Sequence, residues 1–219
     1  MTTDLLAIDH DWSKLDPELA PYLDLAGPYG LPMLRHPLLY DLGVRSVTQV
    51  NTQLAQKRRA VRAAVAEEDW ASVIWLHERP YRLDALDGVL ASGAVAAGSP
   101  EHRALLRMVW CDLELPRQFG YRRIVRSFRA AGFVGEGRPE RGITVYRGCT
   151  SAGKRGVSWT LDSERAAWFA RRFKLAGEHV YAAEVAPAGV LAVLHDRDEA
   201  EVVVDPRGLR NLRQLPDGD

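Results

Sequence analysis

The sequence predicts an α+β fold, in which a mostly helical N-terminal half precedes a compact, mainly antiparallel β core. Between residues 46 and 132 the apolar residues recur at helical spacing, and after the glycine-containing loop 135–142 they form short runs typical of strands. A composition of 47% hydrophobic and 26% charged residues over 219 positions suits a globular protein with a sizeable core. We therefore expect a helical region at 1–135 and a β core at 136–219, either as two domains or as one integrated domain.

The first half divides into an irregular segment and five helices. Residues 1–45 are rich in proline and glycine and show no sustained period, so we expect them to wrap irregularly over the surface of the fold. Asp69 is the expected N-cap of the second helix, and Gly132 is the expected C-cap of the fifth. The helical spacing begins in turn at Val47, Trp70, Leu83, Leu105 and Tyr121.

The second half reads as five short strands and one helix. Runs of β-type residues occupy 143–147, 156–160, 179–185, 190–194 and 201–205. The helix lies between the second and third runs, where Ala166, Phe169 and Ala170 share one face, and its N-cap is Asp162 or Ser163. Because the connections are short, we expect the strands to pair mainly in antiparallel fashion.

The composition also excludes several classes of protein. A formal net charge of zero favours neither a nucleic-acid binder nor an enzyme specialised for acidic substrates. Cys111 and Cys149 have no metal-ligand spacing and the six histidines are scattered, so we expect no metal. The acidic N-terminus is unlike a signal peptide, and no apolar run approaches the roughly 20 residues of a membrane span. We therefore expect a cytoplasmic protein with no membrane partner.

The stretch "GCTSAGKR" (148–155) has the glycine and lysine spacing of a phosphate-binding P-loop. The residue after the lysine should be serine or threonine to hold magnesium, and here it is Arg155. The next run also reads as a strand, whereas a P-loop opens a helix whose N-terminus faces the phosphates. We therefore interpret this stretch as a hairpin loop.

Polar side chains recur where the predicted strands of the second half begin or end. In "DEAEVVVDP" two glutamates, two residues apart, precede a run of valines, and alternation along a strand would place them on one face. Protection of an edge strand from aggregation would explain such charges on their own. An arginine followed by glycine and a hydroxyl pair at neighbouring strand ends favours a site instead, because arginine can bind a phosphate with two parallel hydrogen bonds. The residues concerned are Arg147, Gly148, Ser158, Thr160, Glu199 and Glu201.

Taken in order, "YRG", "SWT" followed by a helix with "AAWFA", and "EAEVVVDP" resemble the signature of the Arg–Ser–Glu class of ADP-ribosyltransferases, the cholera-toxin-like branch of that superfamily. The family has an arginine on the first core strand, a Ser-Thr-Ser-like triplet on the next, and Glu/Gln-x-Glu before a late strand. The resemblance covers residues 143 to about 213 and implies an ADP-ribosyltransferase-like β core. Trp159 in the middle of the triplet and the short link from Arg147 to Ser158 depart from the family pattern.

The resemblance implies that NAD is the substrate and assigns a role to each residue. Arg147 would bind the phosphates and ribose side of NAD, and Ser158 would hold the catalytic Glu201 in place. Glu199 would lie on the loop that meets the acceptor and would assist the attacking group. Further expected NAD contacts are Gly148, Thr160 and Phe169.

The chemistry of NAD cleavage gives an independent reason for two carboxylates. Breaking the bond between nicotinamide and ribose leaves a cationic, oxocarbenium-like ribose, while nicotinamide departs as a neutral pyridine. A carboxylate near the ribose stabilises the cation, and a second carboxylate can take a proton from the nucleophile. The glutamate pair supplies both groups.

The sequence thus predicts a mono-ADP-ribosyltransferase that is toxin-like or linked to phage or defence. Its macromolecular acceptor is unknown; the resemblance implies that a glutamate at position 199 favours a protein arginine, and a nucleic acid is the alternative. An NAD glycohydrolase, which would use water as the acceptor and deplete NAD, fits the same residues. A non-catalytic NAD- or nucleic-acid-binding module with the same fold fits less well, because a binder has no need of arginine, serine and glutamate together.

Overall fold

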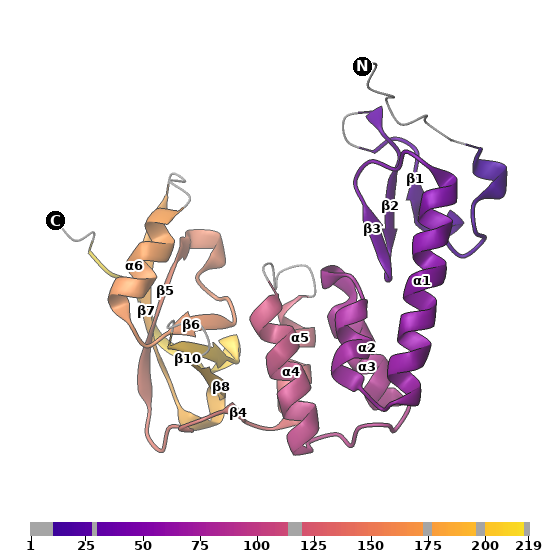
Figure 1. Ribbon diagram of the computed structural model, residues 1–219. Helices are drawn as coiled ribbons and strands as arrows, with labels where there is room; N and C mark the ends of the chain where they lie inside the picture. The colour runs from indigo at the N-terminus through magenta and orange to yellow at the C-terminus, as the bar shows by residue number, and fades with distance from the viewer. Residues whose placement is uncertain (1–10, 28–29, 114–119, 173–176, 196–199, 217–219) are drawn as a thin grey trace, which may run out of the picture. The chain divides into compact units, whose positions relative to one another are not determined.

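The computed structural model of the protein describes residues 11–27, 30–113, 120–172, 177–195 and 200–216. It is an α+β fold, with a helical N-terminal half followed by a mostly antiparallel, seven-stranded mixed sheet (Figure 1). Contacts between residues divide the chain into two compact units, Met1–Ala94 and Val95–Asp219, and each is described by itself.

The first unit combines a small antiparallel sheet with three α-helices. Its strands, in the order β1-β2-β3, are Leu23–Asp24, Met33–His36 and Leu39–Asp41. Its helices are α1 (Val47–Ala66), α2 (Trp70–Leu76) and α3 (Arg82–Ala91). The side chain of Ser46 caps α1 by accepting a hydrogen bond from the backbone N–H of Gln49, and Asp69 caps α2 as predicted. Short 3-10 turns occupy Trp12–Lys14, Ala20–Tyr22 and Arg79–Tyr81.

The segment before α1 departs from the sequence-based expectation. Its described residues do not wrap irregularly over a surface, because Leu19, Leu34 and Val44 are fully buried and pack in one cluster with Leu54 of α1. Strands of two to four residues, interrupted by proline and glycine, are too short to show a period in the sequence. The segment is therefore part of the core of the first unit.

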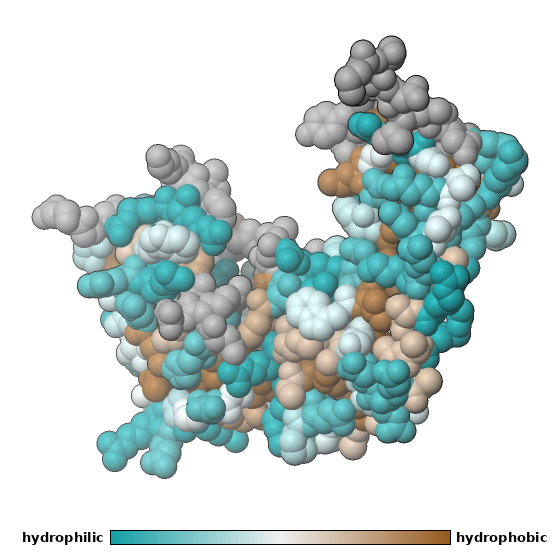
Figure 2. Space-filling model, in the orientation of Figure 1, coloured by the Kyte–Doolittle hydropathy of each residue, from teal (hydrophilic) through white to brown (hydrophobic). Residues whose placement is uncertain are grey.

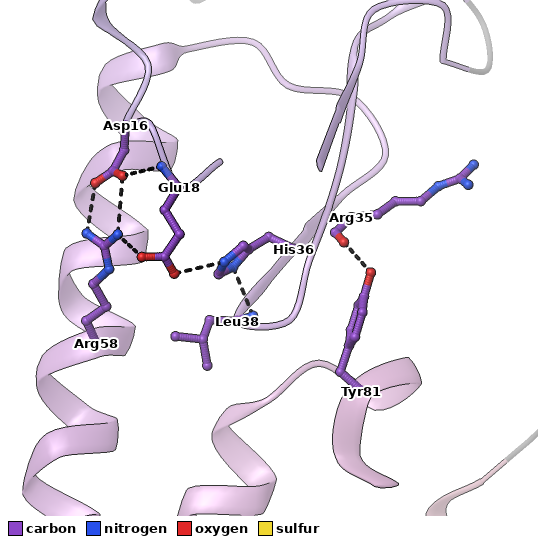
Figure 3. A network of polar contacts seen from close by, with 7 residues as sticks. All are labelled: Asp16, Glu18, Arg35, His36, Leu38, Arg58 and Tyr81. Carbon is purple, nitrogen blue, oxygen red and sulfur yellow. Dashed lines mark hydrogen bonds and ion pairs between the residues drawn. The ribbon is translucent and has the colours of Figure 1, made fainter. Parts of the chain in front are cut away.

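A network of polar side chains joins this segment to α1 and to the β2–β3 hairpin (Figure 3). The guanidinium of Arg58 donates to both carboxylate oxygens of Asp16, at 2.8 and 3.2 Å, and also contacts Glu18. Glu18 Oε1 lies 3.0 Å from Nε2 of the buried His36, whose Nδ1 accepts the backbone N–H of Leu38 at 3.1 Å. Because Nδ1 is an acceptor, the neutral ring carries its proton on Nε2 and donates it to Glu18.

This network predicts that the first unit loses stability in mild acid. Burial lowers the pKa of His36 below its usual 6.5, although Glu18 beside it acts in the opposite direction. Below pH 6.5 His36 takes up a proton more readily in the unfolded chain than in the folded chain. The free energy of unfolding is therefore highest above pH 6.5 and falls as the pH drops towards the pKa of His36 in the folded protein. We expect urea unfolding between about pH 7.5 and about pH 5.5 to show this loss. His36→Asn keeps an acceptor for Leu38 and should flatten the profile; equal slopes for the two proteins would contradict the assignment.

The second unit contains two helices, a seven-stranded sheet and a third helix. The helices are α4 (Pro100–Asp112), α5 (Tyr121–Ala131) and α6 (Ser163–Arg172). The sheet has the order β10-β7-β5-β6-β9-β8-β4, and all pairs are antiparallel except β4 with β8. Its strands are β4 (Val134–Gly135), β5 (Ile143–Thr150), β6 (Ser158–Thr160), β7 (Glu178–Val185), β8 (Val190–Leu194), β9 (Glu201–Val204) and β10 (Leu209–Gln214).

All five strands predicted for the second half are present, and β6 rather than a helix follows Lys154, as expected for a hairpin loop. Asp162 is the cap of α6, since its Oδ1 accepts the backbone N–H groups of Glu164 and Arg165 at 2.8 and 3.2 Å. The second compact unit begins at Val95 and includes α4 and α5, since α4 packs on β4 and α5 packs on β8. The helices before the sheet therefore belong to its unit.

The two faces of the sheet differ in what covers them. One face carries a buried apolar cluster that includes Val145, Trp159, Tyr181 and Val202. α6 packs against β5 and β7 on the other face (Figure 1), and the outer surface of this helix is mainly hydrophilic (Figure 2). The candidate site lies on β5, β6 and β9, between the apolar cluster on one face of the sheet and α6 on the other.

Candidate functional site

The structure places Arg147, Ser158 and Glu201 on three neighbouring strands of the sheet. Arg147 lies on β5, Ser158 is the first residue of β6, and Glu201 is the first residue of β9, in the spatial order β5-β6-β9. Thr160 lies directly opposite Glu201 and also opposite Tyr146. Residues that are far apart in the sequence are therefore brought together by strand pairing.

A hydrogen bond joins the serine to the glutamate. Ser158 Oγ donates to Glu201 Oε1 at 2.7 Å, and only 8% of the Glu201 surface is exposed. Hydrogen bonds to an ionised carboxylate are shorter and stronger than bonds between neutral groups. The serine can therefore fix the orientation of a buried carboxylate, which is the role that the resemblance implies for it.

Thr160 is buried next to this pair, and its hydroxyl has a local structural partner. Its Oγ1 accepts the backbone N–H of Asp162 at 3.1 Å, in the turn that leads into α6. This contact explains a hydroxyl at position 160 by the geometry of the turn. The expected contact between Thr160 and NAD stays a prediction.

Arg147 lies on the opposite face of the sheet from Glu201. Alternation along β5 puts it with Val145 and Cys149 on the core face, whereas Glu201 starts on the opposite face. Its Nε donates to the carbonyl of Gly153 at 3.1 Å, and its Nη1 donates to the carbonyl of Ser158. Arginine and glutamate therefore meet through Ser158, with the guanidinium on its carbonyl and the carboxylate on its hydroxyl, instead of sharing one face of the sheet.

The divergence of β5 from β6 makes room for the guanidinium. The two strands are paired at Tyr146 and Thr160, so the carbonyl of Ser158 accepts from the Arg147 side chain instead of from the β5 backbone. Arg147 thus replaces backbone pairing where the strands part. Its Nη2 has no hydrogen-bond partner within the part of the chain that the structure describes, which leaves donors for an anion.

Gly148 has a structural role in the packing of α6 on β5. A Cβ at this position would lie 2.0 Å from the carbonyl oxygen of Ala166 and 2.4 Å from the backbone nitrogen of Ala170. The backbone that approaches Gly148 is therefore that of α6, and the predicted contact between Gly148 and NAD stays a prediction. The glycine allows the helix to pack closely on β5.

Phe169 lies on α6 in a group of aromatic and arginine side chains. Its half-buried ring packs edge-on against Trp168 at 5.0 Å, and Cζ of Arg165 lies 5.4 Å from its centre. Trp168 is 44% exposed and also has Arg172 near its ring, at 5.1 Å. These contacts give Phe169 a role on the helix surface, and the predicted contact with NAD stays a prediction.

The backbone before Glu201 breaks the alternation on which the glutamate pair was interpreted. Ala200 has φ of 41°, in the left-handed region, and its carbonyl accepts the N–H of Leu161 at 3.1 Å. The interpretation that Glu199 and Glu201 share one face assumes an extended backbone at Ala200, which Ala200 does not have, so the relation between the two glutamates stays a prediction. Glu199 itself lies outside the described residues.

The strained conformation of Ala200 makes it sensitive to side-chain shape. Ala200→Val adds a β-branched side chain at positive φ, which should cost on the order of 1 kcal/mol in the free energy of unfolding. Ala200→Gly should be tolerated, because glycine adopts this conformation without a steric clash. Chemical denaturation of both variants tests the expectation, and a valine variant as stable as the glycine variant would contradict it.

Sequence reasoning missed the residues that hold Arg147. Gly153 supplies a carbonyl, and Gly156 lies directly beneath the guanidinium, with its own carbonyl accepting the indole N–H of Trp159 at 2.9 Å. The large central residue of the triplet, a departure from the family pattern, is thus buried in the core and linked to this loop. The two glycines, three apart after a strand, were the available signal, but Gly153 was interpreted as part of a hairpin loop and Gly156 as the first residue of a strand.

The zero net charge of the chain conceals a difference between the two units. Residues 95–219 contain 20 lysines and arginines against 16 acidic residues, whereas residues 1–94 contain 9 against 13. The candidate site therefore lies in the positively charged unit. Such a balance favours an anionic ligand such as the pyrophosphate of NAD.

Comparison with known proteins adds no relative, since no protein-family model, curated protein or solved structure matches the chain. In the described part of the chain, no helix has the length and apolar character needed to cross a membrane. Nor do three or more histidine, cysteine or acidic side chains gather there in a way that would hold a metal ion. The functional argument therefore depends on the residues of the site.

Proposed function

We propose that the protein is a mono-ADP-ribosyltransferase that cleaves the nicotinamide–ribose bond of NAD. The observation that carries the proposal is the 2.7 Å hydrogen bond from Ser158 on β6, the strand next to that of Arg147, to the buried carboxylate of Glu201 on β9. If Glu201 served only to protect a strand from aggregation, it would not need a serine to orient its carboxylate. The order of arginine, serine and glutamate along the chain supports the same reading through the family resemblance.

In the proposed reaction, the bond between C1′ of the ribose and the nicotinamide nitrogen breaks, and its electron pair leaves with neutral nicotinamide. The ribose carbon becomes cationic, and the carboxylate of Glu201 stabilises that charge. A nucleophile on the acceptor then forms the new bond to C1′, and its proton passes to a base or to water. The products are nicotinamide and an ADP-ribosylated acceptor, so no redox partner is needed.

Arg147 would bind the phosphates of NAD through the donors that the loop does not use. Two of its N–H groups are engaged by Gly153 and Ser158, which hold the guanidinium in place before a ligand arrives. A donor that is already positioned loses less freedom on binding. The remaining Nη2 group and the excess positive charge of the second unit both favour the pyrophosphate of NAD.

The acceptor is the part of the proposal that an experiment must identify. Purified protein should be incubated with NAD labelled in its ADP-ribose part and a cell lysate, with protease- and nuclease-treated samples in parallel. A protease-sensitive labelled band is expected for a protein acceptor, and a nuclease-sensitive band would mean a nucleic acid. Free ADP-ribose without any labelled band would identify an NAD glycohydrolase, and no consumption of NAD would contradict the proposal.

The two glutamates should have separable effects. Glu201 is proposed to act in bond cleavage and Glu199 only in activating the acceptor, so Glu199→Gln should suppress labelling of the acceptor and leave nicotinamide release largely in place. Both readouts are measured in one reaction. Equal loss of nicotinamide release in the Glu199 and Glu201 variants would show that this division of roles is wrong.

A further inference from the structure

The guanidinium of Arg147 lies flat over the backbone of Gly156. A Cβ built on Gly156 would lie 2.7 Å from Arg147 Cζ, 2.8 Å from Nη2 and 2.9 Å from Nε. The three distances are nearly equal, so the missing side chain would point at the face of the guanidinium plane. All three are well below van der Waals contact, and only a glycine at position 156 permits the observed position of Arg147.

Gly156 cannot easily move away from the arginine. Its N–H donates to the carbonyl of Gly153 at 3.0 Å, and its carbonyl accepts the indole N–H of the buried Trp159 at 2.9 Å. The carbonyl of the next residue, Val157, accepts the N–H of Val204 on β9 at 2.8 Å. The loop backbone is therefore tied to the core of the sheet, and the flexible end of Arg147 is the partner that would shift.

Conformational freedom does not explain this glycine. The φ of Gly156 lies outside the left-handed region that favours glycine, so its backbone suits any residue. What the position requires is the absence of a side chain. This separates Gly156 from the glycines of the fold that have positive φ, such as Gly132 and Gly177.

We propose that Gly156 is a positioning residue for Arg147. The guanidinium packs flat against the backbone of Gly156, which has no side chain. The carbonyls of Gly153 and Ser158 accept hydrogen bonds from the guanidinium and fix its rotation within its own plane. Together they determine where Nη2 points. If NAD is the ligand, as the proposed function holds, Gly156 controls the affinity for NAD through Arg147 and leaves the Ser158–Glu201 pair untouched.

The direct test is a spectroscopic one that needs no ligand. The side-chain Nε–H signal of Arg147 in ¹⁵N spectra can be assigned by its disappearance in Arg147→Lys. Gly156→Ala should shift this signal and speed its exchange with water, because the hydrogen bond to Gly153 is displaced. Gly142→Ala is the matched control, since its Cβ would meet its nearest atom at 3.7 Å and its φ is also ordinary. An unchanged Arg147 signal in Gly156→Ala would overturn the inference.

Stability supplies a second test that holds even if Gly156→Ala folds poorly. If the clash with the guanidinium is the cause of any loss, removing the guanidinium must relieve it. Arg147→Ala/Gly156→Ala should then melt at the same temperature as Arg147→Ala alone. A further drop in Tm in the double variant would show that Gly156 is required for some other reason, and the inference would fail.

Binding then links the inference to the proposed function. Gly156→Ala should weaken NAD binding about tenfold and should raise KM much more than it changes kcat, since the effect passes through one displaced contact. Normal NAD affinity in this variant, together with a displaced Arg147 signal, would contradict a role in NAD binding. If the wild-type protein bound no NAD, the proposed function would fail, while the Nε–H and Tm measurements would still decide whether Gly156 positions Arg147.

Discussion

Glu201→Gln should reduce nicotinamide release from NAD by about 10²–10³-fold while leaving the fold intact. Glutamine has nearly the same shape as glutamate, and its amide oxygen can still accept the hydrogen bond from Ser158. It carries no charge, however, so it cannot stabilise the cationic ribose that forms as nicotinamide leaves. Because Glu201 is buried, its charge acts at short range with little screening by solvent.

The control for this prediction is a glutamate on another strand of the same sheet. Glu184 of β7 is exposed, and its Oε2 accepts a hydrogen bond from Asn211 at 2.9 Å, which a glutamine can also accept. Glu184→Gln should therefore release nicotinamide at the wild-type rate. If Glu201→Gln released nicotinamide as fast as the wild-type protein, the catalytic assignment would be wrong. The charge of Glu201 would then serve only to protect the strand from aggregation.

Arg147→Ala should weaken NAD binding on the order of 10- to 100-fold and should also destabilise the second unit. The affinity is lost because a charge-assisted hydrogen bond to phosphate contributes about 1.5–3 kcal/mol. The stability is lost because the carbonyls of Gly153 and Ser158 no longer have their donor, at a cost of about 1–3 kcal/mol. Arg147→Lys should restore part of the NAD affinity and part of the stability, since lysine keeps the positive charge but lacks the planar guanidinium with its several N–H donors.

Calorimetric titration with NAD and thermal unfolding measure the two effects separately. Arg155→Ala is the matched control, because Arg155 is an exposed arginine in the loop that Arg147 holds. It should change neither NAD affinity nor Tm appreciably. A fall in Tm without a change in affinity would assign Arg147 a purely structural role in the loop.

The second half of the fold could be predicted well because most of its strands are rich in apolar and β-branched residues and are bounded by turn residues. The run 190–194 and strand β8 coincide, and the strand starting at Glu201 was predicted to its first residue. β10 was missed because it is a polar strand with an irregularity between Arg210 and Arg213, where Asn211 has a positive φ. Its sequence resembles that of a loop.

The candidate site could be predicted in its residue types but not in its contacts. The interpretation of Glu199 and Glu201 assumed regular alternation, and the left-handed conformation of Ala200 between them has no signature in the sequence. The roles of Gly148 and Gly156 depend on which backbone or side chain lies opposite, and no local pattern encodes this. Pairing of β5, β6 and β9 is a long-range property, so the meeting of Arg147 and Glu201 through Ser158 required the structure.

The central claim is that this chain breaks the nicotinamide–ribose bond of NAD at the Ser158–Glu201 pair. The most direct measurement is the release of nicotinamide from NAD by the purified full-length protein, with and without cell lysate, compared with Glu201→Gln at equal concentration. We expect release by the wild-type protein, stimulation by lysate that contains an acceptor, and loss of both in the variant. No release by the wild-type protein under either condition, or release that persists in Glu201→Gln, would contradict the claim.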